Sequence, residues 1–176
     1  TRSDRDWSSD VCSSDLTGLP LTHVDSHQHM HMLPGVIDIS LDVAASLHLD
    51  AVRISRTPLF TAFAGMGQLI GRLGLFTLSE LSLWKAKRRH FRVPDHFEGI
   101  VAGEAVHEGH FLHILKELRP GTTEVMMHPG TDNARLIPAC DWEHDFEAEM
   151  QAIVSPKVRR MIADKAVKVV NYRDLK

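Results

Sequence analysis

Short apolar runs alternate with longer amphipathic segments from Leu19 to the end of the chain. Strand-like runs begin at Leu21 and at Ala51 (AVRIS), and two more lie at Thr123–Met127 (TEVMM) and Val167–Tyr172 (VKVVNY). Strands that alternate with helices form parallel sheets covered by helices, either as a barrel or as an open sheet. The functional residues of both architectures collect at the carboxyl ends of the strands. The alternation therefore predicts an α/β fold and indicates where its site should lie.

The segments between these runs have helical spacing. Predicted helices span Val36–Leu47, Ala105–Leu118 and Trp142–Val154, two helices are expected within Leu59–His90, and Val93–Ile100 is interpreted as a loop or short strand. Ser155 is predicted to cap a further helix, with Pro156 at the first position, where a missing N–H costs nothing.

The first sixteen residues differ from the rest of the chain. Residues 1–16 (TRSDRDWSSDVCSSDL) show no periodicity and are dominated by Ser and Asp, which predicts disorder. Asp6–Leu16 resembles the conceptual translation of a sequencing-library adapter, and we interpret the segment as an assembly artefact. We therefore expect one domain over residues 17–176, with a natural upstream sequence that differs from residues 1–16.

Charge and composition exclude several classes of function. Twenty basic and twenty-three acidic residues give a net charge of -3, which is too balanced for a nucleic-acid or anionic-membrane surface. No apolar run approaches the roughly 18 residues that a membrane span requires. Cys12 and Cys140 cannot form a disulfide framework, and this favours the cytoplasm. We predict a small-molecule substrate, no nucleic-acid partner and no membrane span.

The segment Thr22–His31 (THVDSHQHMH) is rich in metal-binding side chains. Alternate side chains of a strand share a face, so Asp25 and His27 would point the same way. The same face would also carry His23, and His29 and His31 if the strand continues. A divalent cation or ordered water would satisfy such a face when it is buried. The alternative is an exposed edge strand whose histidines have no role.

His128 directly follows the TEVMM run and precedes Pro129 and Gly130. A turn of this kind restricts the backbone at the edge of the sheet. The position suits a general acid or a substrate contact, and it equally suits a structural histidine that bonds a loop carbonyl.

Charged and aromatic side chains form a third, weaker group. Arg53 and Arg56 lie in VRISRTP, and His96 lies in the later loop PDHFEG. Arginine suits carboxylate or phosphate ligands, and Phe97 could stack on a sugar face. Arg53 could equally hold a salt bridge, and the basic run Lys85–Arg89 is interpreted as a solvated helix face.

Five motifs resemble, in order and spacing, the C-terminal portion of YdjC-like proteins: THVDSHQHMHMLPG, VRISRTPL, PDHFEG, TTEVMMHPG and VNYRDL. The first and fourth are the specific ones. This family includes chitooligosaccharide deacetylases and a type associated with hopanoid biosynthesis. The resemblance implies a (β/α) barrel-like fold, truncated at its N-terminus, and hydrolysis of the N-acetyl group of an amino sugar with a bound divalent metal, Mg²⁺ or Zn²⁺.

The resemblance also assigns roles to particular residues. Family members hold the metal with an aspartate of an N-terminal Asp-Asp motif, a histidine of a second motif, and the first histidine of the Asp-Ser-His motif. Only the last has a counterpart here, His27. The implied base is an upstream aspartate, and Asp25 is predicted to orient His27. His128 would protonate the leaving amine, and Arg53, Arg56 and His96 would contact the sugar.

Two other functions remain open from the residues. An amidohydrolase-type metallohydrolase would bind its metal through both His27 and His29. A metal-binding or sugar-binding module would bind without releasing acetate. A barrel that lacks its opening strands also leaves unpaired edges, so we expect poor solubility or a homodimer formed through those edges.

Overall fold

The computed structural model describes residues 20–56, 66–99 and 105–175, with the side chains of residues 66–72 left out of that description. The predictions for residues 1–16 and for the start of Leu59–His90 therefore lie outside the described residues. The described helices are the 3₁₀ helices η2 (His27–Met32) and η3 (Tyr172–Asp174) and the α-helices α2 (Val36–Ser46), α3 (Met66–Arg88), α4 (Glu108–Lys116), α5 (Asn133–Cys140), α6 (Phe146–Val154) and α7 (Pro156–Asp164). None of these combines the length and the apolar character needed to cross a bilayer.

The strands are short, and they pair in parallel. β1 (His96–Glu98) pairs with β2 (Thr123–Val125), with Phe97 opposite Glu124. Isolated parallel bridges join Val24 to Val52 and Ala51 to Arg92. Because Arg92 shortly precedes β1 in the chain, the four segments pair in chain order. The predicted parallel α/β arrangement is confirmed in this coarser form, as a helix-rich fold with a small parallel sheet.

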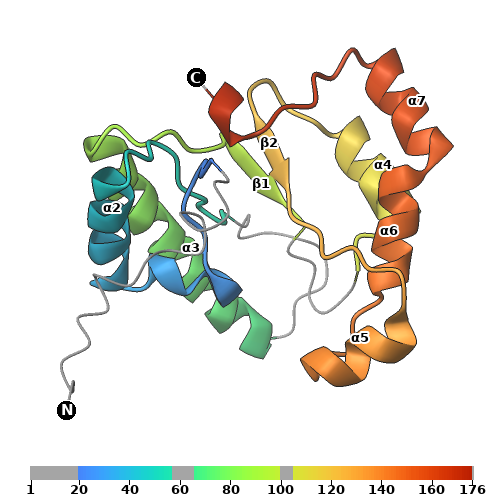
Figure 1. The fold of residues 1–176 in the computed structure, drawn as a ribbon, viewed down its shortest axis with the longest axis horizontal. Helices are drawn as coiled ribbons and strands as arrows, with labels where there is room; N and C mark the ends of the chain where they lie inside the picture. Colours follow the sequence, from blue (N-terminus) through green and yellow to red (C-terminus); the bar gives the residue numbers. More distant parts are fainter. Residues whose placement is uncertain (1–19, 57–65, 100–104, 176) are drawn as a thin grey trace.

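The core lies where α2 and α3 cover one side of these segments (Figure 1). α2 buries Ile37, Leu41 and Ala44, which recur at helical spacing on one face. These side chains pack with a cluster contributed by η2, the strand segments and the end of α3: Met32, Val52, Ile54, Ala86 and Phe91. The α2 pattern predicted from the sequence is confirmed.

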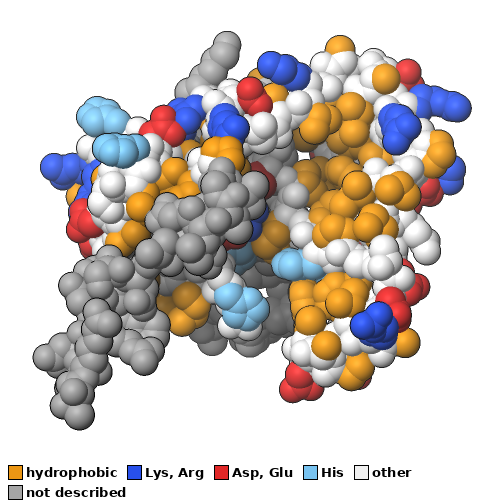
Figure 2. Space-filling model, viewed as in Figure 1, with side chains coloured by type: hydrophobic (Ala, Val, Ile, Leu, Met, Phe, Trp, Pro, Cys, Tyr) orange, Lys and Arg blue, Asp and Glu red, His pale blue; other side chains and the backbone are white. Residues whose placement is uncertain are grey.

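Helices α4, α6 and α7 pack against one another on the other side of the strands (Figure 1). Ile114 and Leu115 of α4, Ala152 of α6 and Val158 of α7 are buried. Figure 2 shows many hydrophobic side chains over this half of the molecule, facing the viewer. The predicted cap is confirmed, since the Ser155 hydroxyl accepts hydrogen bonds from the N–H groups of Lys157 and Val158.

Two local predictions were wrong, and one helix was not predicted. No strand is assigned within Val167–Tyr172, and the chain instead enters η3, whose first turn is closed by an Asn171–Asp174 capping box. The helix predicted from Trp142 begins only at Phe146, where the Asp145 carboxylate caps it. α5 was not predicted, because Pro138 lies inside it and proline normally argues against a helix interior.

Candidate active site

The first histidine motif leaves the strand conformation immediately after its bridge at Val24. Ser26 is extended, but the chain then turns into η2, where Gln28 and His29 have φ values of 50° and 58°. This left-handed backbone is uncommon for residues other than glycine. The condition under which His29 and His31 would join the predicted strand face is therefore not met, because the strand does not continue beyond Ser26.

His31 is a structural histidine. Its ring is buried, with Nε2 at 2.7 Å from the Arg53 carbonyl oxygen and Nδ1 at 2.8 Å from the Ser26 hydroxyl. A carbonyl only accepts, so Nε2 carries the proton and Nδ1 accepts from the hydroxyl. The Ser26 oxygen in turn accepts the His31 backbone N–H at 2.8 Å. With both nitrogens occupied, His31 has no lone pair left for a metal.

His29 and His27 keep ring nitrogens that are available for binding. His29 Nδ1 lies 2.8 Å from the Ser55 hydroxyl, and its ring meets the edge of Phe97. Burial lowers the pKa of His29, and the positive charge of Arg53 adds to this while Asp25 opposes it. The ring of His27 is exposed, and it makes no hydrogen bond to the part of the chain that the structure describes.

Arg53 lies at the centre of a chain of charges. Its guanidinium pairs with the Asp25 carboxylate and, through two nitrogens, with Oε1 of Glu124 at 2.5 and 2.6 Å. The Tyr172 hydroxyl donates a hydrogen bond to the other Glu124 oxygen, and the Tyr172 ring stacks on His23 at 3.7 Å. The structure thus supports the salt-bridge interpretation of Arg53, while a sugar contact by this residue stays a prediction.

The Asp25 carboxylate faces Arg53 rather than the first histidine of η2. Oδ2 pairs with the guanidinium, and Oδ1 lies 4.0 Å from His31 Nδ1. No hydrogen bond joins Asp25 to His27 within the described residues. The predicted role of Asp25 in orienting His27 has no contact in its support and stays a prediction.

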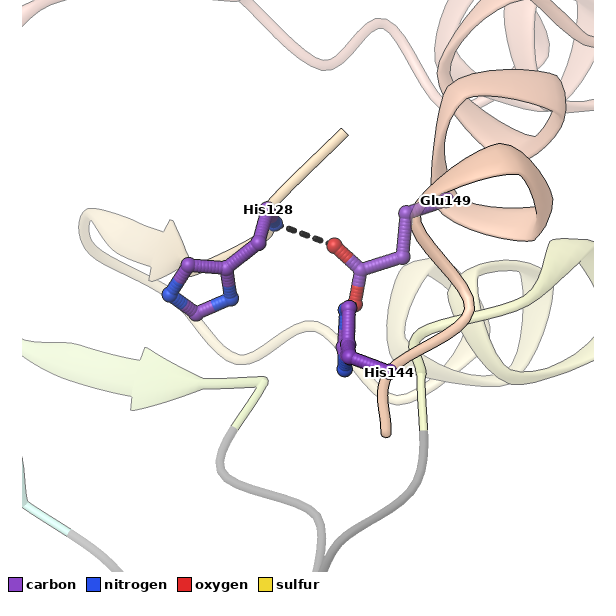
Figure 3. A group of neighbouring side chains, drawn as sticks. All are labelled: His128, His144 and Glu149. Atoms are coloured by element: carbon purple, nitrogen blue, oxygen red, sulfur yellow. Dashed lines mark hydrogen bonds and ion pairs between the residues drawn. The ribbon is translucent and has the colours of Figure 1, made fainter. Parts of the chain in front are cut away.

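His128 is fixed at the end of β2 by its backbone. Its N–H donates a hydrogen bond to Oε2 of Glu149, while Oε1 of Glu149 accepts the Val106 N–H at 2.9 Å (Figure 3). The imidazole itself is exposed. Burial of part of the ring lowers the pKa of His128, Glu149 opposes this, and the charges of His144, Arg53 and His27 add to it.

The electrostatic contacts show which sequence-predicted residues come together. His128 interacts with His27, and His29 interacts with His128, although about a hundred residues separate them in the chain. Two motifs predicted to lie at the ends of parallel strands therefore lie within electrostatic range of each other. This convergence is the main feature of the candidate active site.

Arg56 and His96 lie apart from these contacts. Arg56 pairs through Nε with Glu80 of α3 at 2.7 Å, and both side chains are partly exposed. His96 lies 3.1 Å from the Pro120 carbonyl oxygen and lines a cavity of about 200 Å³ beside α4. Phe97, the next residue of β1, contacts His29 instead, so His96 points to the opposite face of the strand. Their predicted sugar contacts stay predictions.

Sequence reasoning missed His144 and Glu149. Both side chains are buried, and with His128 they place one ligand atom each within 4.8 Å of one another. The available signal was the spacing of α6, where Glu149 occupies the buried stripe formed by Phe146 and Ala152. A carboxylate on such a stripe needs buried partners.

The described residues supply only part of the ligand set that the implied divalent metal needs. His27 offers an exposed and unencumbered imidazole, which suits a ligand. Among the residues that the structure describes, no group of three ligand atoms includes it. His27 is therefore one candidate ligand of a site that these residues do not complete.

Comparisons with known proteins agree with the motifs. The family model described as YdjC-like protein matches residues 12–164, starting inside the segment interpreted as an artefact. A carbohydrate deacetylase of Thermoanaerobacter pseudethanolicus is 27% identical over 159 residues, which cover 90% of this chain and 54% of that protein. A human carbohydrate deacetylase is 28% identical, covering 93% of this chain and 56% of its own length.

A chitooligosaccharide deacetylase of Serratia marcescens is 27% identical, covering 91% of this chain and 55% of that protein. The chain thus spans about half the length of the curated relatives it matches. No solved structure matches it at a significant level. The family match covers most of the chain and contains both specific histidine motifs, and the chain belongs to the YdjC-like protein family.

Proposed function

We propose that this chain is part of a carbohydrate deacetylase that hydrolyses the N-acetyl group of an amino sugar. The observation that carries the proposal is that His27 and His29, from η2, lie within electrostatic range of His128, beyond the end of β2. Relatives named as carbohydrate and chitooligosaccharide deacetylases support the substrate class. We propose a hopanoid glycoside as an alternative substrate of the same chemistry.

In this proposal His27 holds a divalent cation, Mg²⁺ or Zn²⁺, with ligands from outside the described residues. When bound, such a cation polarises the acetamide carbonyl and lowers the pKa of a water molecule. The exposed His27 ring suits this role, because no other described group competes for its nitrogens.

His128 is proposed to protonate the leaving amine. Amide hydrolysis adds water oxygen to the carbonyl carbon, moves a water proton to a base, and breaks the C–N bond as the nitrogen gains a proton. Burial lowers the pKa of His128 and so favours the neutral ring. It must therefore gain a proton before it donates one, and its exposed position gives it access to the reacting groups.

Arg53 is proposed to have a positioning role, which it exerts through its ion pairs with two carboxylates. The guanidinium is occupied by Asp25 and Glu124, so it fixes the strand ends beneath the histidines. Arg56 and His96 lie apart from His27 and His128. Their proposed contacts with the sugar therefore require a substrate that extends beyond these two histidines.

Two specific observations favour alternative functions. His29 uses only Nδ1 for Ser55, so its Nε2 could bind a metal together with His27, as an amidohydrolase would require. The chain also spans about half of its relatives, and His27 is a single candidate ligand, which suits a sugar-binding or metal-binding module.

Metal binding and acetate release from chitobiose, measured with added Mg²⁺ or Zn²⁺, separate these functions. We expect His27→Ala to remove Mg²⁺ binding and His29→Ala to retain it, whereas an amidohydrolase-type site would lose Mg²⁺ binding in both variants. Where acetate is released, His128→Ala should lower the rate by about 100-fold or more. His48→Ala, in an exposed histidine beyond α2, serves as the control.

Chitobiose binding without acetate release would favour the module. Failure of the chain both to bind chitobiose and to release acetate from it would contradict the deacetylase and the sugar-binding functions together.

Three wider features belong to the same proposal. We propose a (β/α) barrel for the complete domain, because the described segments already pair in parallel and in chain order. The cytoplasmic location and the homodimer are also proposed. Exposed apolar side chains support self-association, including Ile39 and Val43 of α2 and Ile153 and Val154 of α6.

A further inference from the structure

His144 is a buried imidazole without a hydrogen-bond partner. Only 5% of its surface is exposed, and neither ring nitrogen makes a hydrogen bond among the described residues. The ring stacks on Trp142 with centroids 4.2 Å apart and meets the edge of Phe146. A buried polar group without a hydrogen bond is destabilising, so such a side chain normally has a partner.

The nearest candidate partner is the Glu149 carboxylate. His144 Nε2 lies 3.2 Å from Oε1 of Glu149, but the two do not align as a hydrogen bond. Each carboxylate oxygen already accepts a backbone N–H, from Val106 and His128, and each retains a second lone pair. Two ligands of a tetrahedral zinc ion, with bonds of about 2.0–2.1 Å, lie about 3.3 Å apart. The observed separation fits that geometry.

His128 is the third potential metal ligand beside His144 and Glu149. Figure 3 shows one ring nitrogen of His128 on the side that faces Glu149 and His144. One ligand atom from each of the three residues lies within 4.8 Å of the others. His128 is exposed, which leaves a fourth position open to solvent. Two imidazoles, one carboxylate and an open position make up a donor set typical of zinc.

We propose that His128, His144 and Glu149 bind one divalent transition-metal cation of the zinc class, at a site separate from the ligand role of His27. The cation would satisfy the buried His144 nitrogen and the remaining lone pair of Glu149. Binding would also occupy the ring of His128, so a filled site and proton donation by His128 exclude each other. This last consequence rests on the proposed function, whereas the site itself does not.

Titration of the chelator-treated chain with Zn²⁺, followed by calorimetry, and with Co²⁺, followed by its visible spectrum, tests the proposal. We expect one site of defined stoichiometry and an intense, tetrahedral Co²⁺ spectrum. His128→Ala is the main variant, because its exposed ring can be removed while its backbone N–H still binds Glu149. It should weaken Zn²⁺ binding by about 10-fold to 100-fold. Glu149→Gln should weaken binding similarly.

Two control variants separate this site from others. His27→Ala removes the ligand of the proposed deacetylase site, and His113→Ala removes an exposed histidine on α4. Both should leave the zinc affinity of this site unchanged. The proposal is overturned if the parent chain binds no zinc, if His128→Ala binds it as tightly as the parent, or if His27→Ala abolishes binding.

Discussion

Tyr172 is the chain's single tyrosine, so its ionisation can be followed without overlap. Burial and the hydrogen bond to Glu124 raise its pKa above the ordinary value. An unfolded tyrosine ionises near pH 10. The stabilisation from the protonated hydroxyl is therefore complete below about pH 10 and is lost as the pH rises further.

We expect the ultraviolet absorbance of tyrosinate to appear only as the chain unfolds in alkali. Glu124→Gln should bring the pKa of Tyr172 towards its ordinary value, and Tyr172→Phe should abolish the signal. A native chain that forms tyrosinate near pH 10 would contradict the buried contact between Tyr172 and Glu124.

At the level of single residues, the sequence predicted candidate residues, and their roles stay predictions. Asp25, His27 and His128 were predicted from their positions after strand-like runs, and the two histidines lie within electrostatic range of each other in the structure. The hydrogen bonds that occupy both ring nitrogens of His31 could not be predicted. The partners are a serine hydroxyl and a backbone carbonyl, which the spacing of residues does not reveal. His144 was missed because a lone histidine within a predicted helix carries no pattern.

At the level of elements, predictions succeeded where local chemistry determines the structure. The Ser155–Pro156 pair starts α7 as predicted, and the apolar spacing of α2 gives its buried face. Predictions failed where distant contacts decide. VKVVNY has the composition of a strand, yet Val169 is 75% exposed. The residues that follow are held by side-chain hydrogen bonds, such as that of Tyr172, rather than by the backbone hydrogen bonds of a β-ladder. The left-handed turn at Gln28 has no glycine to signal it.

Ser155 joins two helices as well as capping one. Its hydroxyl donates to Oε1 of Glu108 on α4 at 2.6 Å and accepts the Lys157 and Val158 N–H groups at 3.1 and 3.4 Å. We expect Ser155→Ala to lower the free energy of unfolding by about 1–2 kcal/mol, measured by urea denaturation. Ser46→Ala, on the exposed end of α2, should change it by less than about 0.5 kcal/mol. Equal effects of the two substitutions would show that the cap contributes nothing.

At the level of the whole molecule, residues near both ends of the chain meet beside the strands. Arg92, next to β1, donates hydrogen bonds to the carbonyl oxygens of Arg173 and Leu175 at 3.1 and 2.5 Å and pairs with Asp50. Arg173 in turn donates to the Pro20 carbonyl oxygen at 3.0 Å. The C-terminal segment is thus bound to the sheet through arginine and Tyr172 rather than as the predicted strand.

Arg92→Ala should therefore loosen the C-terminal segment and lower the free energy of unfolding by about 2 kcal/mol, because two carbonyl partners and one carboxylate partner are lost together. We expect faster hydrogen exchange at the amides of residues 171–175, while α2 and α6 keep their protection. Arg89→Ala is the matched control, since Arg89 pairs with Asp42 and Asp38 at the surface and such pairs contribute about 0–1 kcal/mol. Unchanged exchange at residues 171–175 in Arg92→Ala would mean that Tyr172 and its carboxylate partner hold the end of the chain alone.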